Sequence, residues 1–231
     1  MDDVKPLTEP FLPSCVFAAW VRLDGGCGER HDIELPEIIS RAIPRRQGSY
    51  RGGRACADHA LRQLGFSFNQ PIWPKMGDDR APIWPGEVIG SISHSDDIAL
   101  AVVAMRNDID GVGVDVERPI AKDEAASLAR QVCQPFELKI LQPTRWNGHE
   151  FTAIFSGKEA LYKAIYPTVR RFVDFDEAHL VRMENDVLTF SFSTSLRNEL
   201  GRPTINVRLH EWQGHILTIA VLHCKNYAIP F

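Results

Sequence analysis

The 231-residue sequence predicts a mixed α/β fold made of two pseudo-symmetric α/β lobes, residues 1–108 and 109–231, with the active site in the cleft between them. Three observations lead to this prediction. Segments with the two-residue period of a strand alternate with segments that have the period of a helix. Each half contains a strand, a helix of about four turns with a charged residue on its apolar stripe, and a closing hairpin. The hydrophobic fraction of 44% and the charged fraction of 24% are typical of a globular protein.

The predicted first lobe opens with a strand over residues 15–21, which the turn-forming Asp24-Gly25-Gly26 ends. A helix is predicted over residues 49–64, because a serine can cap its start and a glycine follows its end. Arg54 falls on the apolar stripe of this helix. The rest of the lobe is predicted to contain an ordered loop over residues 69–90, rich in Pro, Gly and Trp, and a hairpin of strands 88–93 and 98–104.

The predicted second lobe opens with a strand over residues 111–117, where valines alternate with other residues. A helix over residues 123–132 follows. A longer helix is predicted over residues 151–165, and we expect Pro167 to stop it. The lobe closes with three alternating segments that predict strands, residues 187–193, 204–209 and 216–223.

Composition excludes several classes of protein. The net charge of −4 argues against a generally basic nucleic-acid binder. No apolar run approaches the roughly 20 residues that cross a bilayer, so no membrane partner is predicted. The N-terminus carries acids where a secretory signal would carry bases, which favours a cytoplasmic protein. Five scattered cysteines without a CxxC pair favour reduced thiols over disulfides or a zinc site.

The small net charge hides two opposed blocks. Residues 41–62 contain six arginines and one aspartate, a local charge of +5. Residues 108–124 contain six acids, one arginine and one lysine, a local charge of −4. A basic first lobe and an acidic second lobe would suit a metal ion together with a multiply phosphorylated ligand. The alternative for most of these arginines is a solvated helix face.

Two acidic residues, Asp115 and Glu117, share one face of the strand predicted at residues 111–117. Their Cα atoms are expected about 7 Å apart, since a strand rises about 3.3 Å per residue. Carboxylates this close repel unless a positive charge lies between them. A hard divalent cation such as Mg²⁺, which prefers oxygen ligands, would supply that charge. The alternative is a solvated strand face with two unrelated acids.

The helix predicted at residues 151–165 carries charged residues on its apolar side. Helical spacing places Glu159 and Lys163 in line with two phenylalanines. A carboxylate in this position needs a partner, because an unpaired buried charge is very costly. Either Glu159 is a third metal ligand or a base, with Lys158 and Lys163 contacting phosphate, or Glu159 and Lys163 form an ordinary i,i+4 ion pair. The spacing leaves both interpretations open.

His94 lies where a predicted strand ends in a turn, in the segment Ser91-Ile92-Ser93-His94-Ser95. A histidine there can donate to an anion, assisted by the Ser93 hydroxyl and by backbone amides. The alternative is a structural turn histidine. No Gly-x-Ser-x-Gly elbow is present, and His210 and His215 have the wrong spacing for a metalloprotease helix. Hydrolase and zinc-protease functions are therefore not predicted.

Together these motifs resemble the two-lobed 4′-phosphopantetheinyl transferases that serve siderophore, polyketide and nonribosomal peptide synthetases, including the enterobactin type. The family signature is a Gly-x-Asp-x-Glu strand followed about forty residues later by a Trp/Phe-Ser-x-Lys-Glu-Ala/Ser-x-x-Lys helix. Both halves occur in that order. They are Gly113-Val114-Asp115-Val116-Glu117 and Phe155-Ser156-Gly157-Lys158-Glu159-Ala160-Leu161-Tyr162-Lys163. Weaker matches are the Ser-His segment, Arg45-Arg46 with Gly53-Arg54, and Asp79-Arg80-Ala81-Pro82-Ile83-Trp84-Pro85.

The resemblance implies transfer of 4′-phosphopantetheine from coenzyme A to a serine of an apo acyl or peptidyl carrier protein, with release of adenosine 3′,5′-bisphosphate. It implies Mg²⁺ held by Asp115, Glu117 and Glu159. Glu159, or a water on the metal, would accept the serine proton. Lys163 and His94 would contact the pyrophosphate.

The same resemblance implies a set of coenzyme A ligands. Arg46 and Arg54 would bind the 3′-phosphate, and Arg80 with Pro82 would lie beside the adenine. Lys158 matches the motif and would face either coenzyme A or the carrier protein. Family habit implies a monomer. The alternative, from another functional class, is a non-catalytic module that binds coenzyme A or a nucleotide and has a regulatory role.

Overall fold

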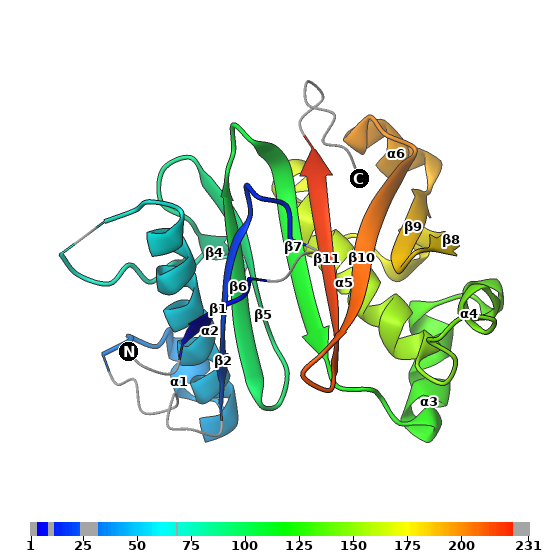
Figure 1. Cartoon of the computed structure of the whole chain (residues 1–231), viewed down its shortest axis with the longest axis horizontal. Coiled ribbons are helices and arrows are strands. Elements are labelled where there is room, and N and C mark those ends of the chain that lie inside the picture. The colour runs from blue at the N-terminus through cyan, green and yellow to red at the C-terminus, as the bar shows by residue number, and fades with distance from the viewer. Residues whose placement is uncertain (1–3, 9–11, 24–31, 68, 224–231) are drawn as a thin grey trace. The chain divides into compact units, whose positions relative to one another are not determined.

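The computed structural model in Figure 1 describes residues 4–8, 12–23, 32–67 and 69–223. The chain divides into two compact units, the first ending at Asp110 and the second covering Gly111–Leu222. The boundary between the units therefore lies between residues 110 and 111, two residues after the predicted boundary at residue 108. Each unit combines a sheet with helices, which confirms the mixed α/β class. The predicted site between the two lobes stays a prediction.

The first unit has a four-stranded sheet in the order β1-β2-β6-β5. Its neighbouring strands are antiparallel, and helix α2 packs on the sheet. A small two-stranded ladder, β3 with β4, lies within the predicted ordered loop. The elements are β1 Lys5–Pro6, β2 Phe17–Arg22, α1 Glu37–Ser40, α2 Pro44–Gln63, β3 Lys75–Met76, β4 Pro82–Ile83, β5 Val88–His94 and β6 Ile98–Met105.

Two glycines bring α2 close to this sheet. A Cβ at Gly52 would lie 2.7 Å from a Leu23 methyl carbon, and one at Gly53 would lie 2.6 Å from a methyl carbon of Ile92 on β5. Contacts this short would force the Leu23 and Ile92 side chains to shift. The helix is therefore seated closely against the sheet at its third turn.

The second unit has a five-stranded sheet in the order β7-β11-β10-β9-β8, crossed by the long helix α5. The hairpin β10–β11 is drawn in orange and red in Figure 1. The elements are β7 Ile109–Glu117, α3 Lys122–Val132, α4 Pro135–Leu141, α5 Glu150–Val169, the 3₁₀ turn η2 Phe175–Glu177, β8 Ala178–Glu184, β9 Val187–Phe192, α6 Thr194–Leu200, β10 Thr204–Trp212 and β11 His215–His223.

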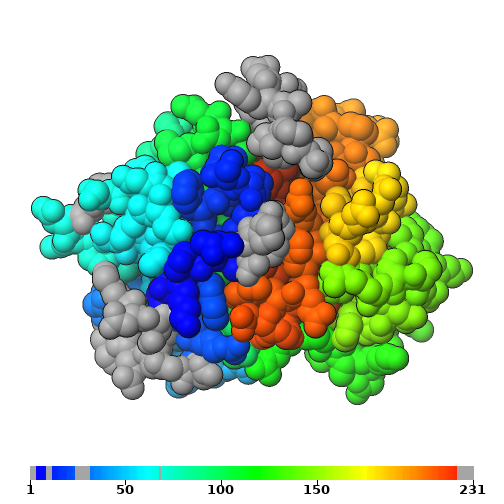
Figure 2. All heavy atoms as spheres, viewed as in Figure 1, coloured from blue at the N-terminus to red at the C-terminus, as the bar shows by residue number. Residues whose placement is uncertain are grey.

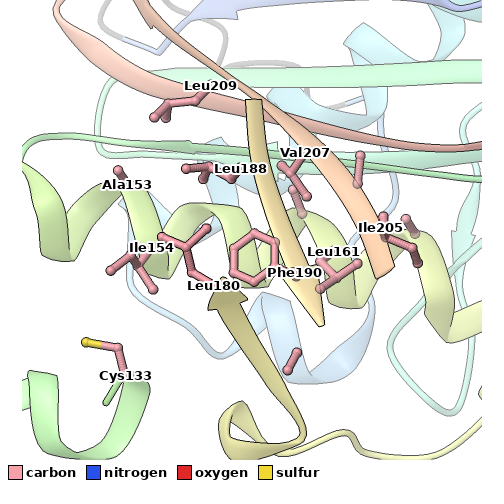
Figure 3. Packing of buried hydrophobic residues seen from close by; sticks show 14 of the residues in the cluster. Cys133, Ala153, Ile154, Leu161, Leu180, Leu188, Phe190, Ile205, Val207 and Leu209 are labelled. Atoms are coloured by element: carbon pink, nitrogen blue, oxygen red, sulfur yellow. The ribbon is translucent and has the colours of Figure 1, made fainter. Parts of the chain in front are cut away.

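The core of the second unit lies between α5 and the sheet. Ile154 and Leu161 on α5 are buried among Leu188 and Phe190 of β9, as Figure 3 shows. Phe190 is fully buried. Burying side chains of this size contributes about 1.5–3 kcal/mol each, so this layer fixes α5 on the sheet.

The predicted internal repeat is visible in the topology. In the first unit β2 precedes helix α2, the hairpin β5–β6 follows it, and β2 pairs with β6. In the second unit β7 precedes α5, the hairpin β10–β11 closes the unit, and β7 neighbours β11. The second unit adds α3 and α4 before α5, and β8, β9 and α6 after it.

Two predicted helix ends were wrong. Helix α2 begins at Pro44 rather than Ser49, because a proline suits the first helical position, where its missing N–H is not needed. Ser49 is mid-helix, and its hydroxyl donates to the Arg45 and Arg46 carbonyls. Helix α5 continues through Pro167 to Val169. Pro167 removes a single hydrogen bond in the last turn, and the helix ends where Arg170 turns left-handed at φ 51°.

Several elements were not predicted from the sequence: α1, α4, α6, β1 and β8. Helix α6 could have been predicted from the residues at its two ends. The Ser193 hydroxyl caps its start by accepting from the Leu196 amide, and Gly201 ends it at φ 64°. Strand β8 is interrupted by a register shift between Leu180 and Arg182, which obscures its alternation.

Cys15, Cys56 and Cys133 are free thiols. Cys27, Cys224 and the turn predicted at Asp24-Gly25-Gly26 lie outside the described residues. Within the described part of the chain, no helix is both long and apolar enough to cross a membrane.

Candidate active site

Strand β7 positions the first two predicted metal ligands. Asp115 and Glu117 lie two residues apart near its end and so project from one face. Asp115 is almost fully buried, with 3% exposure, and Glu117 is partly buried. Valines 112, 114 and 116 are buried, as the alternation predicts.

Helix α5 approaches β7 at two glycines. A Cβ at Gly113 would lie 1.9 Å from the Ala160 carbonyl oxygen, and one at Gly111 would lie 2.3 Å from that of Ala164. Only glycine allows strand and helix backbones to meet this closely. The Gly-x-Asp motif therefore has a packing role, and it brings the α5 side chains Glu159 and Lys163 to the acidic end of the strand.

Lys163 bridges the two elements. Its Nζ donates to Asp115 Oδ1 at 2.7 Å and to the Val114 carbonyl at 3.2 Å. Lys163 also interacts electrostatically with Glu159, the partner predicted along the helix, and acts to lower the pKa of that carboxyl. Through Asp115, a carboxylate of the signature motif, Lys163 ties α5 to β7.

Four side chains interact electrostatically with one another, and we call them the acidic cluster: Asp115, Glu117, Glu159 and Lys163. Burial, with the charge of Asp115 adding to it and Lys163 opposing it, raises the pKa of Glu117 to about 8. Burial also raises the pKa of Glu159, again with Asp115 adding to the shift and Lys163 opposing it. The raised pKa values mean that this group of acids resists carrying all its negative charges at once, which is the condition that a bound cation relieves.

The acidic cluster fits Mg²⁺ by its chemistry. Its donors are carboxylate oxygens, the ligands that Mg²⁺ prefers, and their mutual repulsion favours a cation. Among the described residues, no three His, Cys, Asp or Glu side chains are arranged to hold a metal ion as they stand. The donor set fits the metal, and the side chains would have to converge to bind it.

In the first unit α2 carries the predicted phosphate-binding arginines. Arg46 contacts the imidazole of His94, the last residue of β5, while Arg45 pairs with Asp96 in the following turn. The charge of Arg46 also lowers the pKa of Arg54, so the two guanidinium groups lie within electrostatic range of each other.

Arg54 is an unusually buried cation. It is 6% exposed, its guanidinium lies 4.2 Å from the Tyr50 ring centroid, and its buried Nε has no hydrogen-bond partner among the described residues. Burial lowers its pKa. A buried guanidinium with an unused N–H is a ready partner for a phosphate.

The other predicted coenzyme A ligands of the first unit are Ser93, Arg80 and Pro82. Ser93 is buried within β5 beside His94. Arg80 is exposed at the turn between β3 and β4, at φ 66°, and Pro82 belongs to β4. The predicted role of Arg80 and Pro82 beside the adenine stays a prediction.

Lys158 is not placed to bind coenzyme A. Its side chain is 3% exposed, and its Nζ donates to the carbonyls of Val132 and Phe175, at 2.8 and 3.0 Å, and to the carboxylate of Glu137. These acceptors use all three N–H groups of an ammonium. The structure therefore corrects the predicted coenzyme A contact and gives Lys158 a structural role.

Glu137, the partner of Lys158, was missed by the sequence analysis. It is fully buried in α4, a two-turn helix too short to show a clear period. The available signal was Lys158 itself, since a lysine on the buried side of a helix requires an acid nearby.

Comparison with known protein families identifies matches over most of the chain. Residues 34–104 match the profile described as the 4′-phosphopantetheinyl transferase N-terminal domain, and residues 111–229 match that of the 4′-phosphopantetheinyl transferase superfamily.

Individual relatives cover most of the chain. Enterobactin synthase component D of Salmonella typhimurium is 36% identical over 86% of this chain and 83% of its own length. The 4′-phosphopantetheinyl transferase Npt of Nocardia iowensis is 32% identical over 71% of each chain. The crystal structure of holo-[acyl-carrier-protein] synthase from Neisseria meningitidis is 19% identical, with a TM-score of 0.39, and matches 50% of this chain and 99% of that one. The profile and relative matches show that the chain belongs to the 4′-phosphopantetheinyl transferase superfamily and is an enzyme of this type.

Proposed function

We propose that this enzyme transfers the 4′-phosphopantetheine arm of coenzyme A to a serine hydroxyl of an apo acyl or peptidyl carrier protein, with Mg²⁺ as its metal. The observation that carries the proposal is the acidic cluster, in which one strand and one helix place three carboxylates and a lysine together. Such a cluster suits the binding of a metal ion and a pyrophosphate side by side.

In the proposed reaction the serine oxygen forms a bond to the phosphorus that carries pantetheine. The bond from that phosphorus to the bridging pyrophosphate oxygen breaks, and adenosine 3′,5′-bisphosphate leaves. Glu159 accepts the serine proton, and its raised pKa makes it a stronger base than an ordinary carboxylate. Lys163 holds Asp115 in place and offers positive charge to the pyrophosphate.

Asp115, Glu117 and Glu159 would hold the metal. When bound, Mg²⁺ would neutralise charge that develops on the leaving phosphate. In the first unit, Arg54 and Arg46 are proposed to bind the 3′-phosphate, because Arg54 is buried with an unused Nε–H and Arg46 lies within its electrostatic range. His94, in contact with Arg46, is proposed as a pyrophosphate ligand.

The test is intact-mass spectrometry of a purified apo carrier protein after incubation with this enzyme, coenzyme A and Mg²⁺. The expected result is the gain of one phosphopantetheine group, lost when a chelator is added and when the acceptor serine is replaced by alanine. Carriers of siderophore and nonribosomal peptide synthesis are the first to try, because relatives named enterobactin synthase component D align over most of the chain. Coenzyme A binding without transfer to any carrier would refute the proposal and favour the non-catalytic binding module.

A further inference from the structure

The ion pair between Glu137 and Lys158 is a buried junction in the second unit. Besides accepting from Lys158, the Glu137 carboxylate accepts from the Leu180 amide on β8 and from the Gln134 amide at the start of α4, each at 2.8 Å. Lys158 in turn donates to the carbonyls of Val132, at the end of α3, and Phe175, in the 3₁₀ turn. This pair therefore joins α5 to α3, α4, β8 and that turn.

The junction holds α5 on a side that faces away from β7 and β11. On the side that faces these two strands the helix is fixed where Ala160 meets Gly113, and where the Ser156 hydroxyl lies 2.8 Å from that of Thr218 on β11. On the other side it is fixed through Lys158 to α3 and α4, whose green atoms form part of the surface in Figure 2. A helix held on both sides has little freedom to rotate about its axis.

Glu159 is the residue whose position depends most directly on this restraint. It follows Lys158, and successive residues of a helix point about 100° apart. Lys158 points to α3 and α4, whereas Glu159 interacts electrostatically with Asp115 and Lys163. A rotation of α5 that released Lys158 would therefore move the Glu159 carboxylate relative to the acidic cluster.

Stability alone does not account for such a pair. Replacing a buried ion pair by apolar residues is often neutral or stabilising, because the desolvation of both charges offsets their attraction. We propose that the Glu137–Lys158 pair is a positioning element that sets the rotation of α5 and so aims the Glu159 carboxylate at the metal site. This inference rests on the proposed function, which makes Glu159 a metal ligand.

The experiment uses the double variant Glu137→Gln/Lys158→Met, which removes both charges and leaves no unpaired one. Metal affinity is measured by electron paramagnetic resonance during Mn²⁺ titration of the protein without substrates. We expect the double variant to remain folded and to bind Mn²⁺ more weakly by about tenfold or more, the usual effect of losing a residue that orients a ligand. The Mg²⁺ concentration for half-maximal transfer should rise in parallel, while the KM for coenzyme A stays unchanged.

A second variant and a control keep the test decisive if the double variant fails to fold. Glu137→Asp keeps the charge and shortens the side chain by one carbon, so a smaller loss of Mn²⁺ affinity is expected. Asp186→Asn is the control, because it breaks an ion pair with Arg145 in the same unit that is not bonded to α5. Its Mn²⁺ affinity should equal that of the parent enzyme.

Two outcomes would overturn the inference. If the folded variants lose thermal stability and keep the parent Mn²⁺ affinity, the pair is structural only. If the KM for coenzyme A rises and metal binding does not change, Lys158 is a coenzyme A ligand after all. Failure of the parent enzyme to modify any carrier would refute the proposed function instead, and the Mn²⁺ comparison would still decide the role of the pair.

Discussion

We expect Gly113→Ala to push α5 away from β7. The added Cβ would lie 1.9 Å from the Ala160 carbonyl oxygen and 2.6 Å from the Ala164 amide nitrogen. Both are backbone atoms of α5, so the whole helix must move for the clash to be relieved. An ordinary carbon–oxygen contact is about 3.3 Å, so the helix must retreat by roughly 1.4 Å.

A displacement of this size has two calculable effects. Overpacking of this kind costs about 1–3 kcal/mol of unfolding free energy. For a protein of this length each kcal/mol lowers Tm by about 2–4 °C, so Tm should fall by about 2–12 °C. Because α5 carries Glu159 and Lys163, a shift of about 1 Å should also reduce kcat by roughly 10²-fold.

The assay pairs thermal unfolding with intact-mass measurement of carrier modification at a temperature where every variant is folded. Gly157→Ala is the matched control, because its Cβ would meet only side-chain atoms of Leu188 and Phe190, at 2.9 and 3.0 Å. These side chains are buried and would have to repack, which offsets the gain of about 1 kcal/mol in helix propensity of alanine over glycine. The control should therefore lose less stability than Gly113→Ala and keep the parent kcat, because no backbone atom of α5 is pushed away from β7. Parent-like Tm and kcat for Gly113→Ala would show that α5 does not press on β7 as described.

Three further predictions concern single side chains. Asp115→Asn removes the charge that binds Lys163, so kcat should fall by roughly 10²–10³-fold with circular dichroism unchanged, and full activity would exclude a metal role. Arg54→Ala should raise the KM for coenzyme A by roughly 10- to 100-fold and leave that for 3′-dephospho-coenzyme A nearly unchanged; an equal rise for both would exclude the 3′-phosphate contact. Burial lowers the pKa of His210 to about 4, below the unfolded value of about 6.5, so its stabilising contribution is complete above pH 6.5 and lost toward pH 4. In urea unfolding at several pH values between 6.5 and 4, the unfolding free energy of His210→Gln should fall less steeply with decreasing pH than that of the parent. Equal slopes for the two proteins would refute the low pKa assigned to His210.

Periodicity predicted the parts of the fold that repeat most regularly. The valines of β7 and the long hairpins alternate cleanly, so their strands appear within a few residues of the predicted positions. Helix ends were harder to predict, because a proline favours the first turn of a helix and disfavours its later turns. Pro44 starts α2, whereas Pro167 is tolerated in the last turn of α5, where only one hydrogen bond is lost. Neither outcome depends on local sequence alone.

The acidic cluster was predictable for a different reason. Strand spacing places Asp115 and Glu117 on one face whatever the rest of the chain does. That Lys163 would donate to Asp115 depends on how closely α5 packs on β7, which no local pattern reveals. The burial of Lys158 is likewise a tertiary result, since its acceptors come from residues 17 to 26 positions away in the chain.

The signature motif therefore specifies packing as much as chemistry. Its glycine admits the backbone of α5, its alanine keeps that contact short, and its first lysine is buried against α4. Only the acids and the second lysine belong to the acidic cluster. A chain with the same acids and a larger residue in place of Gly113 would carry the ligands and hold them too far apart. This is why the whole pattern, rather than its carboxylates, predicts the site.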